Sequence, residues 1–430
     1  YKIVFLFIIG LSSQAQDLLT LEDAVKIALE NNYDIKIAEN NSKIDATNNN
    51  LANAGMLPSF NANFTNNNSQ LDTKQTQGDG TIRELENAKN MNLTYGIGLD
   101  WTIFDGLSMF ARKEQLSVLE QQGKAELQTA ILTRISDVYT TYFDLVQQQQ
   151  VLASIDTAIV ISNQRLTTAQ NRFSIGKASK LEVLNAQVDL NSDLSLLLKQ
   201  KELYRIAKIR MNELLIRDVQ TDFKVAKEIS FEQNLDFNEL KSTAEKQNPQ
   251  LQAQILSKKV ADLNLKQVKG NRYPTVRITS GYNFTRSEAS LGFITQSSGQ
   301  GFVYGVTATV PIFNGFLQNR NEKVAKYQVE NAGFLLEQQK LSLSSQLSSL
   351  FASYQTNLEL VKVEEKNLEI AKQNLDITLA KFKIGTITTI EFRTAQQNFV
   401  DASVRYSNAQ YVTKLSEINL KELAGTLKLN

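Results

Sequence analysis

One short motif occurs twice in this chain, at equivalent places within two long helical patterns. The first copy runs from Arg172 to Gln187 and the second from Lys381 to Gln396. The copies lie 209 positions apart and share identical Phe, Ile, Gly, Glu, Ala and Gln residues. A motif of this kind between two helices predicts a helical hairpin with the motif at its tip. The sequence therefore predicts two such hairpins, built on one plan.

Each tip carries the signals that end one helix and begin the next. The glycine suits the left-handed backbone conformation just after a helix end, where a Cβ is costly. A Ser or Thr three residues later can cap the next helix, and the Glu three residues further on completes a capping box. These residues are Gly176, Ser179 and Glu182 in the first copy and Gly385, Thr388 and Glu391 in the second.

Long helical patterns lead into both tips. The first runs from about residue 107 to 173 without a proline, which corresponds to roughly 100 Å of helix. Apolar residues recur every seven positions in both patterns, and a strict heptad predicts a left-handed supercoil against a neighbouring helix. The heptad positions are Val138, Leu145, Leu152, Ile159, Leu166 and Phe173 in the first pattern and Leu347, Tyr354, Val361, Leu368, Leu375 and Phe382 in the second.

A different periodicity is found in the segments that precede the long helices. Apolar residues, several of them aromatic, alternate there with small or polar residues. A period of two predicts β-strands with one apolar face and one polar face. We expect a polar loop, from residue 66 to about residue 90, between the first two strands. The alternating segments are 60–64, 93–101, 276–284 and 302–310.

The plan of helix, β-hairpin and helical hairpin is found twice, which predicts a duplicated α+β architecture. The first helix is expected from residue 20 to about residue 54, and Asn248-Pro249 is expected to lie at the start of the equivalent helix. Pro58 and Pro274 are 216 positions apart, whereas Phe104 and Phe313 are 209 apart. The second β-hairpin is therefore shorter, in a loop that tolerates deletion. The predicted boundaries are 16–217 for the first repeat, with hairpins at about 59–104 (β) and 107–217 (helical), 218–237 for a linker, and 238–430 for the second repeat, with hairpins at about 274–313 (β) and 315–424 (helical).

Residues 1–15 are typical of the end of a secretory signal peptide. A short apolar run from Ile3 to Leu11 precedes Ser13-Gln14-Ala15, which offers small residues at a cleavage site. A buried N-terminal strand is the alternative interpretation. No later apolar run reaches the length of about 18 residues that a transmembrane helix requires.

The composition argues against several classes of function. A formal net charge of +1 provides no basic field for nucleic acid, so no nucleic-acid partner is expected. The chain has no Cys and no His, which excludes disulfides, thiolate nucleophiles and a Ser-His-Asp triad and removes the commonest metal ligand. The sequence contains no glycine-rich phosphate loop. We therefore expect no cofactor, no metal and no enzyme activity, with a hydrolase built on two carboxylates as the alternative.

Taken in order, these features resemble the TolC-like outer-membrane efflux family. The resemblance rests on Leu21-Glu22-Asp23-Ala24, on Asn248-Pro249, on the Ile-Phe-Asp-Gly and Ile-Phe-Asn-Gly turns at 103–106 and 312–315, and on the doubled tips. It implies a homotrimer in the outer membrane. Each chain would give four strands to a shared 12-stranded β-barrel and its long helices to a periplasmic α-helical barrel. Four strands alone cannot close a barrel, because outer-membrane barrels need about eight or more.

The resemblance also implies a function and partners. The expected function is the exit duct of a tripartite efflux or type I secretion system, supplied by an inner-membrane transporter through a periplasmic adaptor. A non-porous periplasmic or surface coiled-coil scaffold is the alternative. In a barrel, the apolar strand faces would contact outer-membrane lipid. The candidate lipid-facing residues are Tyr95, Ile97, Trp101, Tyr282, Tyr304 and Val306.

By the same resemblance, the tips would form the periplasmic entrance of the channel. Glu391 matches an acidic residue expected to line the constriction, Thr394 stands where a second acid is expected, and Glu182 is the equivalent of Glu391 in the first tip. Both glutamates could instead be helix caps only, and Phe173 and Phe382 could be packing residues rather than gate residues. The residues expected to contact the adaptor are Arg172, Phe173, Gly176, Lys177, Ser179, Lys381, Phe382, Gly385 and Thr388.

Overall fold

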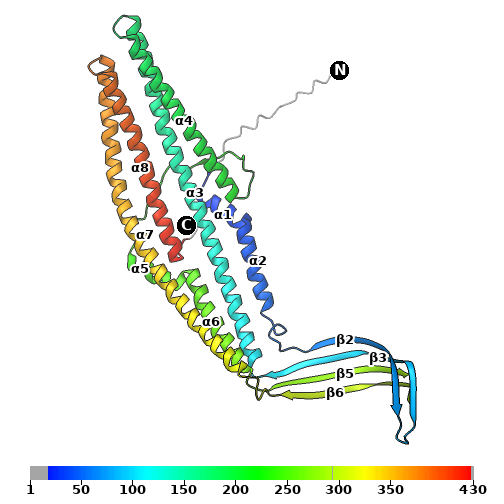
Figure 1. Ribbon diagram of the computed structural model, residues 1–430. Helices are drawn as coiled ribbons and strands as arrows, with labels where there is room; N and C mark the ends of the chain where they lie inside the picture. The colour runs from blue at the N-terminus through cyan, green and yellow to red at the C-terminus, as the bar shows by residue number, and fades with distance from the viewer. Residues whose placement is uncertain (1–17, 293, 428–430) are drawn as a thin grey trace, which may run out of the picture. The chain divides into compact units, whose positions relative to one another are not determined.

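The computed structural model describes residues 18–292 and 294–427, and these form two compact units (Figure 1). Both units draw on both halves of the chain. Of the described residues, the first unit comprises 18–40, 125–252 and 338–427, and the second comprises 41–124, 253–292 and 294–337. The signal peptide predicted at residues 1–15 lies outside the described residues.

Parts of two helical hairpins make up most of the first unit. In the first hairpin α3 (Ser108–Ser174) leads to α4 (Lys180–Leu214), and in the second α7 (Leu317–Ile384) leads to α8 (Thr389–Ala424). The starts of α3 and α7, up to Lys124 and Glu337, belong to the second unit. Within this unit the hairpins lie alongside each other, with both tips at the same end (Figure 1). The two tips are therefore where the duplicated motif predicts them.

The predicted heptad is buried along α7 but only partly buried along α3. Tyr354 and Phe382 in α7 are each 1% exposed. In α3 Val138 and Leu145 are buried, whereas Phe173, at the end of the helix, is 43% exposed. A straight helix has 3.6 residues per turn, so a seven-residue pattern drifts around its surface and the neighbouring helices decide which face is covered. Between Val151 and the tip, the buried residues of α3 are Ile155, Ala158, Ser162, Arg165 and Ala169.

The main apolar core of the first unit lies at the base of the hairpins. There β1 (Leu18–Leu19) pairs in parallel with β4 (Lys224–Val225), and α1 (Leu21–Asn31) packs its apolar face onto the long helices. Part of the segment predicted as a linker thus contributes to this core. Its buried members include Val25, Leu145, Met211, Leu215 and Phe223.

The single helix predicted over residues 20–54 consists of two helices. After α1, the chain turns at Asn32 and continues as α2 (Tyr33–Asn48). The Asn32 Oδ1 accepts a hydrogen bond from the backbone N–H of Asp34 (2.9 Å). This bond caps the second helix and competes with helical bonding across the junction. The prediction of one helix was wrong because the apolar spacing continues past Asn32, although the Asn32 side chain interrupts the backbone hydrogen bonding of the helix.

The second half contains the same break, and here the predicted helix start is confirmed. The helix α5 (Phe237–Gln247) ends before Asn248, and α6 (Pro249–Gly270) begins after it. The Asn248 Oδ1 accepts from the backbone N–H of Leu251 (2.8 Å). Proline at the first helical position loses no hydrogen bond, because that N–H has no partner within the helix.

An antiparallel sheet in the order β2-β3-β5-β6 dominates the second unit. The polar loop predicted between residues 66 and 90 is wrong, because β2 and β3 stay paired through it and only residues 77–81 form the turn. Where both faces of the sheet are exposed, strands can pair through their backbones without alternating apolar side chains. The apolar alternation therefore underestimates the length of β2 and β3. The strands are β2 (Ser59–Thr76), β3 (Ile82–Asp105), β5 (Thr275–Ala289) and β6 (Gln296–Thr309).

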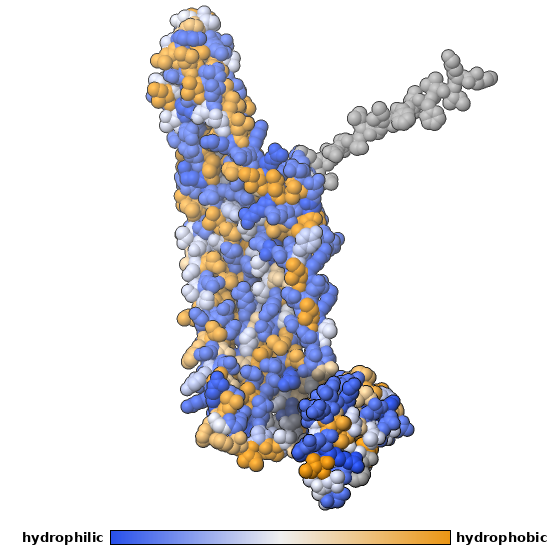
Figure 2. Space-filling model, turned by 45° about the vertical axis from the view of Figure 1, so that its right-hand side comes forward, coloured by the Kyte–Doolittle hydropathy of each residue, from blue (hydrophilic) through white to orange (hydrophobic). Residues whose placement is uncertain are grey.

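Among the described residues, no helix is both long enough and apolar enough to cross a bilayer. Figure 2 shows apolar side chains interspersed with polar ones over the visible surface of the long helices.

Candidate functional site

The second tip, between α7 and α8, has the geometry that the sequence predicts. Gly385 is left-handed, with φ of 79°, and the N–H of Thr386 donates to the carbonyl of Lys381 (3.1 Å), as in a Schellman motif. The Oγ1 of Thr388 accepts from the N–H of Glu391 (3.2 Å), and the Glu391 Oε2 accepts from the N–H of Thr388 (3.1 Å). The capping box is therefore complete at this tip.

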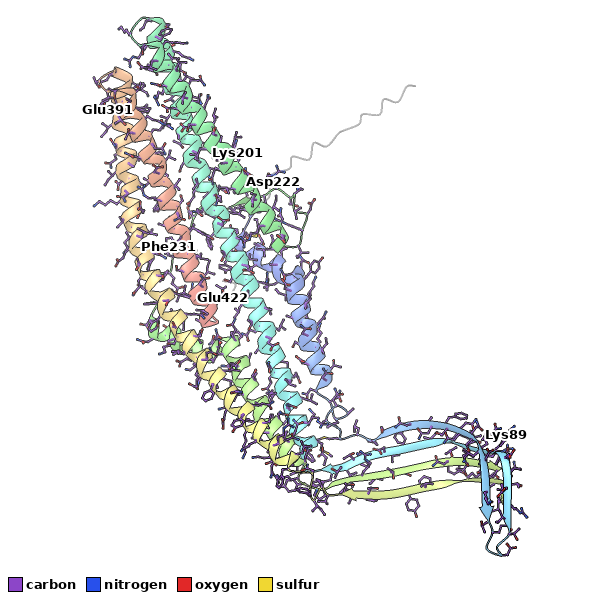
Figure 3. All side chains as sticks on the ribbon, viewed as in Figure 1. Lys89, Lys201, Asp222, Phe231, Glu391 and Glu422 are labelled. Atoms are coloured by element: carbon purple, nitrogen blue, oxygen red, sulfur yellow. The ribbon has the colours of Figure 1, made fainter. Side chains whose placement is uncertain are left out.

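Glu391 and Thr394 lie one helical turn apart in the first part of α8, and Glu391 stands at the tip (Figure 3). Both side chains are exposed in the single chain. The Thr394 hydroxyl donates to the carbonyl of Ile390 (3.0 Å), which satisfies it within the helix. Capping does not bury the Glu391 carboxylate, so a structural role and a role at a constriction are compatible.

The first tip, between α3 and α4, differs from the second in its carboxylate. Gly176 has φ of 76°, and the N–H of Lys177 donates to the Arg172 carbonyl (2.7 Å). The Ser179 Oγ accepts from the N–H of Glu182 (3.3 Å), but the reciprocal bond is not formed. Instead the Glu182 Oε1 lies 3.5 Å from the Arg172 guanidinium. The prediction of two equal capping boxes is wrong here, because a cation competes for the carboxylate.

The two equivalent phenylalanines have different environments. Phe382 is 1% exposed and stacks on Phe392, with ring centroids 5.0 Å apart, so it is a packing residue as the heptad suggests. Phe173 is exposed, and the Nζ of Lys180 lies 5.6 Å from its ring centroid, a distance at which a cation is attracted by the ring. The exposed lysines of the tips are Lys177, Lys180, Lys381 and Lys383.

A buried polar cluster that the sequence analysis missed joins the two hairpins near their tips. Arg393 of α8 makes two hydrogen bonds of 2.9 Å to the two carboxylate oxygens of Asp193 in α4. The Ser162 hydroxyl donates to the same carboxylate (2.5 Å). Arg165 of α3 makes an ion pair of 2.6 Å with Asp189. We call these residues, together with Gln396, the inter-hairpin cluster.

Gln396 extends the cluster into the apolar interior. Its side chain is fully buried, and its Nε2 donates to the Ser162 Oγ (2.7 Å) and to the carbonyl of Ala158 (2.8 Å). Burial alone would lower the pKa of Arg393, but the hydrogen bonds and the charges of Asp193 and Asp189 outweigh burial and raise that pKa. The guanidinium therefore stays charged, and its charge is matched by two carboxylates.

One sequence signal could have indicated this cluster. Ser162 and Arg165 interrupt the apolar spacing that Ile155, Ala158 and Ala169 continue on the buried face of α3. Polar residues at such positions are buried only when they have partners. The partners could not be read from the same helix, because they belong to α4 and α8.

The predicted lipid-facing residues share one face of the sheet. Register places Ile97 beside Tyr282 and Tyr282 beside Phe302, whereas the next row, on the opposite face, is Gly98, Gly281 and Val303. Adjacent strand residues alternate between faces, so one face is apolar and aromatic and the other is small and polar. The exposed residues of the apolar face include Tyr95, Ile97, Trp101, Tyr282, Tyr304 and Val306.

Solved structures with this fold are outer-membrane channels. The chain superposes on the outer-membrane channel OprN with a TM-score of 0.79 at 16% sequence identity, covering 94% of this chain and 90% of OprN. The open-state MtrE channel of Neisseria gonorrhoeae gives a TM-score of 0.76 at 17% identity, covering 95% of this chain and 90% of that channel. The likeness shows that the chain has the fold of these channel proteins.

Sequence comparison identifies the family. The model of the outer membrane efflux protein family matches residues 24–215 and 240–426. The chain belongs to that family, which confirms the predicted family and the outer-membrane location. TolC of Escherichia coli K12 is 24% identical over 317 residues, which is 70% of this chain and 63% of TolC. The matched part of the chain therefore spans less than two thirds of that relative.

Proposed function

We propose that this chain is the protomer of a homotrimeric exit duct in the outer membrane. The duct is passive, performs no catalysis, and passes substrates that an inner-membrane transporter delivers through a periplasmic adaptor. The observation that carries the proposal is the four-stranded sheet, which has one apolar face and two edges without a partner strand in the described chain.

Open edges are not tolerated in lipid, because each unpaired N–H and C=O costs several kcal/mol there. β2 and β6 each pair on one side only within the described residues. Pairing β6 of one copy with β2 of the next removes the edges, and three copies supply twelve strands. The apolar face then contacts lipid, and the face that carries Gly98, Gly281 and Thr279 lines a polar interior.

The helical hairpins suit the periplasmic half of the duct. Their tips lie at one end of the first unit, so three copies would set six tips around one opening. Three Glu391 carboxylates at that opening would create a local negative field that favours cations. The half-buried Arg172 and the exposed Phe173 and Lys177 of the first tip are available to the adaptor. The exposed Lys381 and Thr388 of the second tip are available as well.

A pair of valines on β6 tests the proposal. Val306 lies on the apolar face and Val303 on the opposite face, and both are exposed in the single chain. Arginine on a lipid face costs about 2–4 kcal/mol near the bilayer midplane, whereas a lumen-facing arginine is tolerated. Val306→Arg should therefore reduce the amount of chain recovered as a trimer in the outer-membrane fraction, and Val303→Arg should not.

Equal recovery of both variants would contradict the duct and favour a non-porous coiled-coil scaffold. Recovery of the unmodified chain as a detergent-free monomer would contradict it as well. Native mass spectrometry of the detergent-extracted protein measures the oligomeric state directly. Pull-down of this assembly with a periplasmic adaptor then tests the proposed partner.

A further inference from the structure

Two turns of the second unit join a strand to a long helix, and they have the same backbone conformation. The first turn connects β3 to α3, and the second connects β6 to α7. Gly106 and Leu107 have φ values of 69° and 67°, and the equivalent Gly315 and Phe316 have 66° and 62°. The two turns are 209 positions apart in sequence, so the duplication has preserved an unusual pair of left-handed residues.

The surroundings of the two turns differ. A Cβ added at Gly106 would lie 2.1 Å from the carbonyl oxygen of Gly270, at the end of α6. The same α6 runs along the start of α3, where the Ser108 hydroxyl donates to the Gln267 carbonyl (3.1 Å). A Cβ added at Gly315 would meet no described atom within 4 Å. The first turn therefore has the end of a helix packed against its glycine, whereas the space beside Gly315 is open. α6 does contact the start of α7, where the Gln318 Nε2 donates to the Val268 carbonyl (2.6 Å), but it leaves Gly315 uncovered.

The missing neighbour of the second turn can be identified from the duplication. The pairing of α3 with α6 is antiparallel: Ser108 meets Gln267, and the Gln115 Nε2 lies 3.5 Å from the Val260 carbonyl. On α7 the equivalents of Ser108 and Gln115, 209 positions later, are Leu317 and Val324. In α2 and the turn after it, the equivalents of Gln267 and Val260, 216 positions earlier, are Leu51 and Ile44.

These four equivalent side chains are apolar and exposed. Leu317 and Val324 are 48% and 44% exposed, and Leu51 and Ile44 are 47% and 55% exposed. Ile44 lies within α2, and Leu51 lies three residues beyond its end, in a turn. The contact between α3 and α6 within one chain is polar at Ser108, which hydrogen-bonds to Gln267. The equivalent positions on α7 and at the end of α2 carry exposed apolar side chains instead. Packing these apolar side chains against each other would remove them from water and so lower the free energy of the assembly.

We propose that a second copy of this chain covers the turn at Gly315, with Leu51 of one copy against Leu317 of the next and Ile44 against Val324. The occupant is a second copy because the matching surface, at the end of α2, belongs to this same chain. That end already packs on its own α3, where the Asn49 Nδ2 donates to Glu120 (2.6 Å). The surface of Ile44 and Leu51 on one copy thus contacts the surface of Leu317 and Val324 on the next copy. Contacts between two different surfaces are head-to-tail, and such contacts can close a ring.

The proposal rests on the homotrimer of the proposed function and adds to it a specific contact and register. It predicts that α2 of one copy runs antiparallel to α7 of the next. Shifting this register by seven residues would move a side chain by about 10 Å along the helix. That is more than the Cα separation of about 7 Å beyond which a disulfide cannot form.

Cysteine cross-linking tests the register, and the chain is suited to it because it contains no native Cys. Leu51→Cys in one tagged copy and Leu317→Cys in a second, differently tagged copy are co-expressed, and the extracted oligomer is oxidised. A disulfide joining the two tags on a non-reducing gel is expected. The pair Ile44→Cys with Val324→Cys should behave in the same way. The mismatched pair Ile44→Cys with Leu317→Cys is the control and should give less than about a tenth of the cross-linked product, because the equivalent Val260 and Ser108 lie about two helical turns out of register.

Three results decide the matter. Cross-linking of both matched pairs but not of the control supports the proposed contact. A trimer, seen by native mass spectrometry, in which neither matched pair cross-links or the control cross-links equally well, overturns the contact and leaves the proposed function standing. Absence of any oligomer in unmodified protein overturns the proposed function and the contact together.

Discussion

Replacing Asp193 with alanine should weaken the contact between the two helical hairpins near their tips. Asp193 accepts two hydrogen bonds from Arg393 and one from Ser162. Its side chain is 9% exposed and that of Arg393 is 21% exposed, so water can replace only a small part of what is lost. Alanine would leave the partly buried Arg393 cation with one carboxylate, Asp189 at 3.6 Å, and with the Gln396 Oε1 at 3.4 Å.

The magnitude follows from the burial of this pair. Removing one partner of a buried ion pair costs about 3–5 kcal/mol, because the other charge is left uncompensated. We take the lower end, about 3 kcal/mol, since Asp189 still compensates part of the charge. At about 1.4 kcal/mol per factor of ten, the local opening of α8 beside α4 should become on the order of 100-fold more frequent.

Hydrogen exchange measured by mass spectrometry on the detergent-extracted protein reports this opening. Peptides from the start of α8 and from the distal half of α3 should lose protection, and those from α1 should not. The matched control is Arg405→Met, also on α8, whose ion pair with Glu364 (3.1 Å) joins an arginine that is 53% exposed to a carboxylate that is 13% exposed. After the substitution Glu364 still accepts a hydrogen bond from the Asn367 Nδ2 (3.3 Å). Because water screens the exposed arginine, this pair contributes about 1 kcal/mol, and protection should change by no more than about fivefold.

A double variant distinguishes loss of the pair from general disruption. In Asp193→Ala with Arg393→Met both charges are absent, so no uncompensated cation remains. Pairs replaced by apolar groups are often neutral in stability, and exchange should return most of the way to that of unmodified protein. The reasoning is refuted if Asp193→Ala exchanges like the Arg405→Met control, or if the double variant exchanges as fast as Asp193→Ala.

The remaining predictions concern α7, α8 and the tip between them. Burial raises the pKa of Glu422 above its ordinary value of 4.5. The folded state therefore binds the Glu422 proton more tightly, and stability falls as pH rises through that raised pKa. Glu422→Gln should accordingly raise the melting temperature at neutral pH, and this gain should vanish below about pH 4.5, as calorimetry in detergent would show. Gly385→Ala places a Cβ in a left-handed residue (φ 79°) and should lower stability by about 1–2 kcal/mol. The helical Gly333→Ala, at a site with open space, should raise it by about 0.5–1 kcal/mol. Glu391→Gln should reduce cation preference in planar bilayers; unchanged preference would leave capping as the only role of Glu391.

Much of the candidate site could be predicted because its signals are local. A glycine followed by Ser or Thr and then Glu specifies a helix end and a helix start over a few residues. The tips at Gly176 and Gly385 are therefore where the sequence places them. Alternation with a period of two likewise predicted which residues share the apolar face of the sheet, since the pleat fixes that relation within each strand.

The duplication also predicts that the two strand-to-helix turns share one backbone conformation, which a single repeat could not indicate. Equivalent positions 209 or 216 residues apart have the same backbone conformation, as the left-handed pairs at Gly106 and Gly315 demonstrate. Only the structure revealed that one of these turns is covered and the other is open. The sequence specified the shape of the turn, and the packing of α6 determined the difference.

What the tertiary structure alone decided is which residues meet. Asp193 and Arg393 are 200 positions apart, and no periodicity connects them. The exposed Phe173 and the buried Phe382 occupy the same place in their repeats, yet their surroundings differ because burial depends on the neighbours of a helix and not on its own pattern. Periodicity within a chain segment fixes secondary structure and the side that can be buried. The partners that bury it come from distant segments, and these are set by packing.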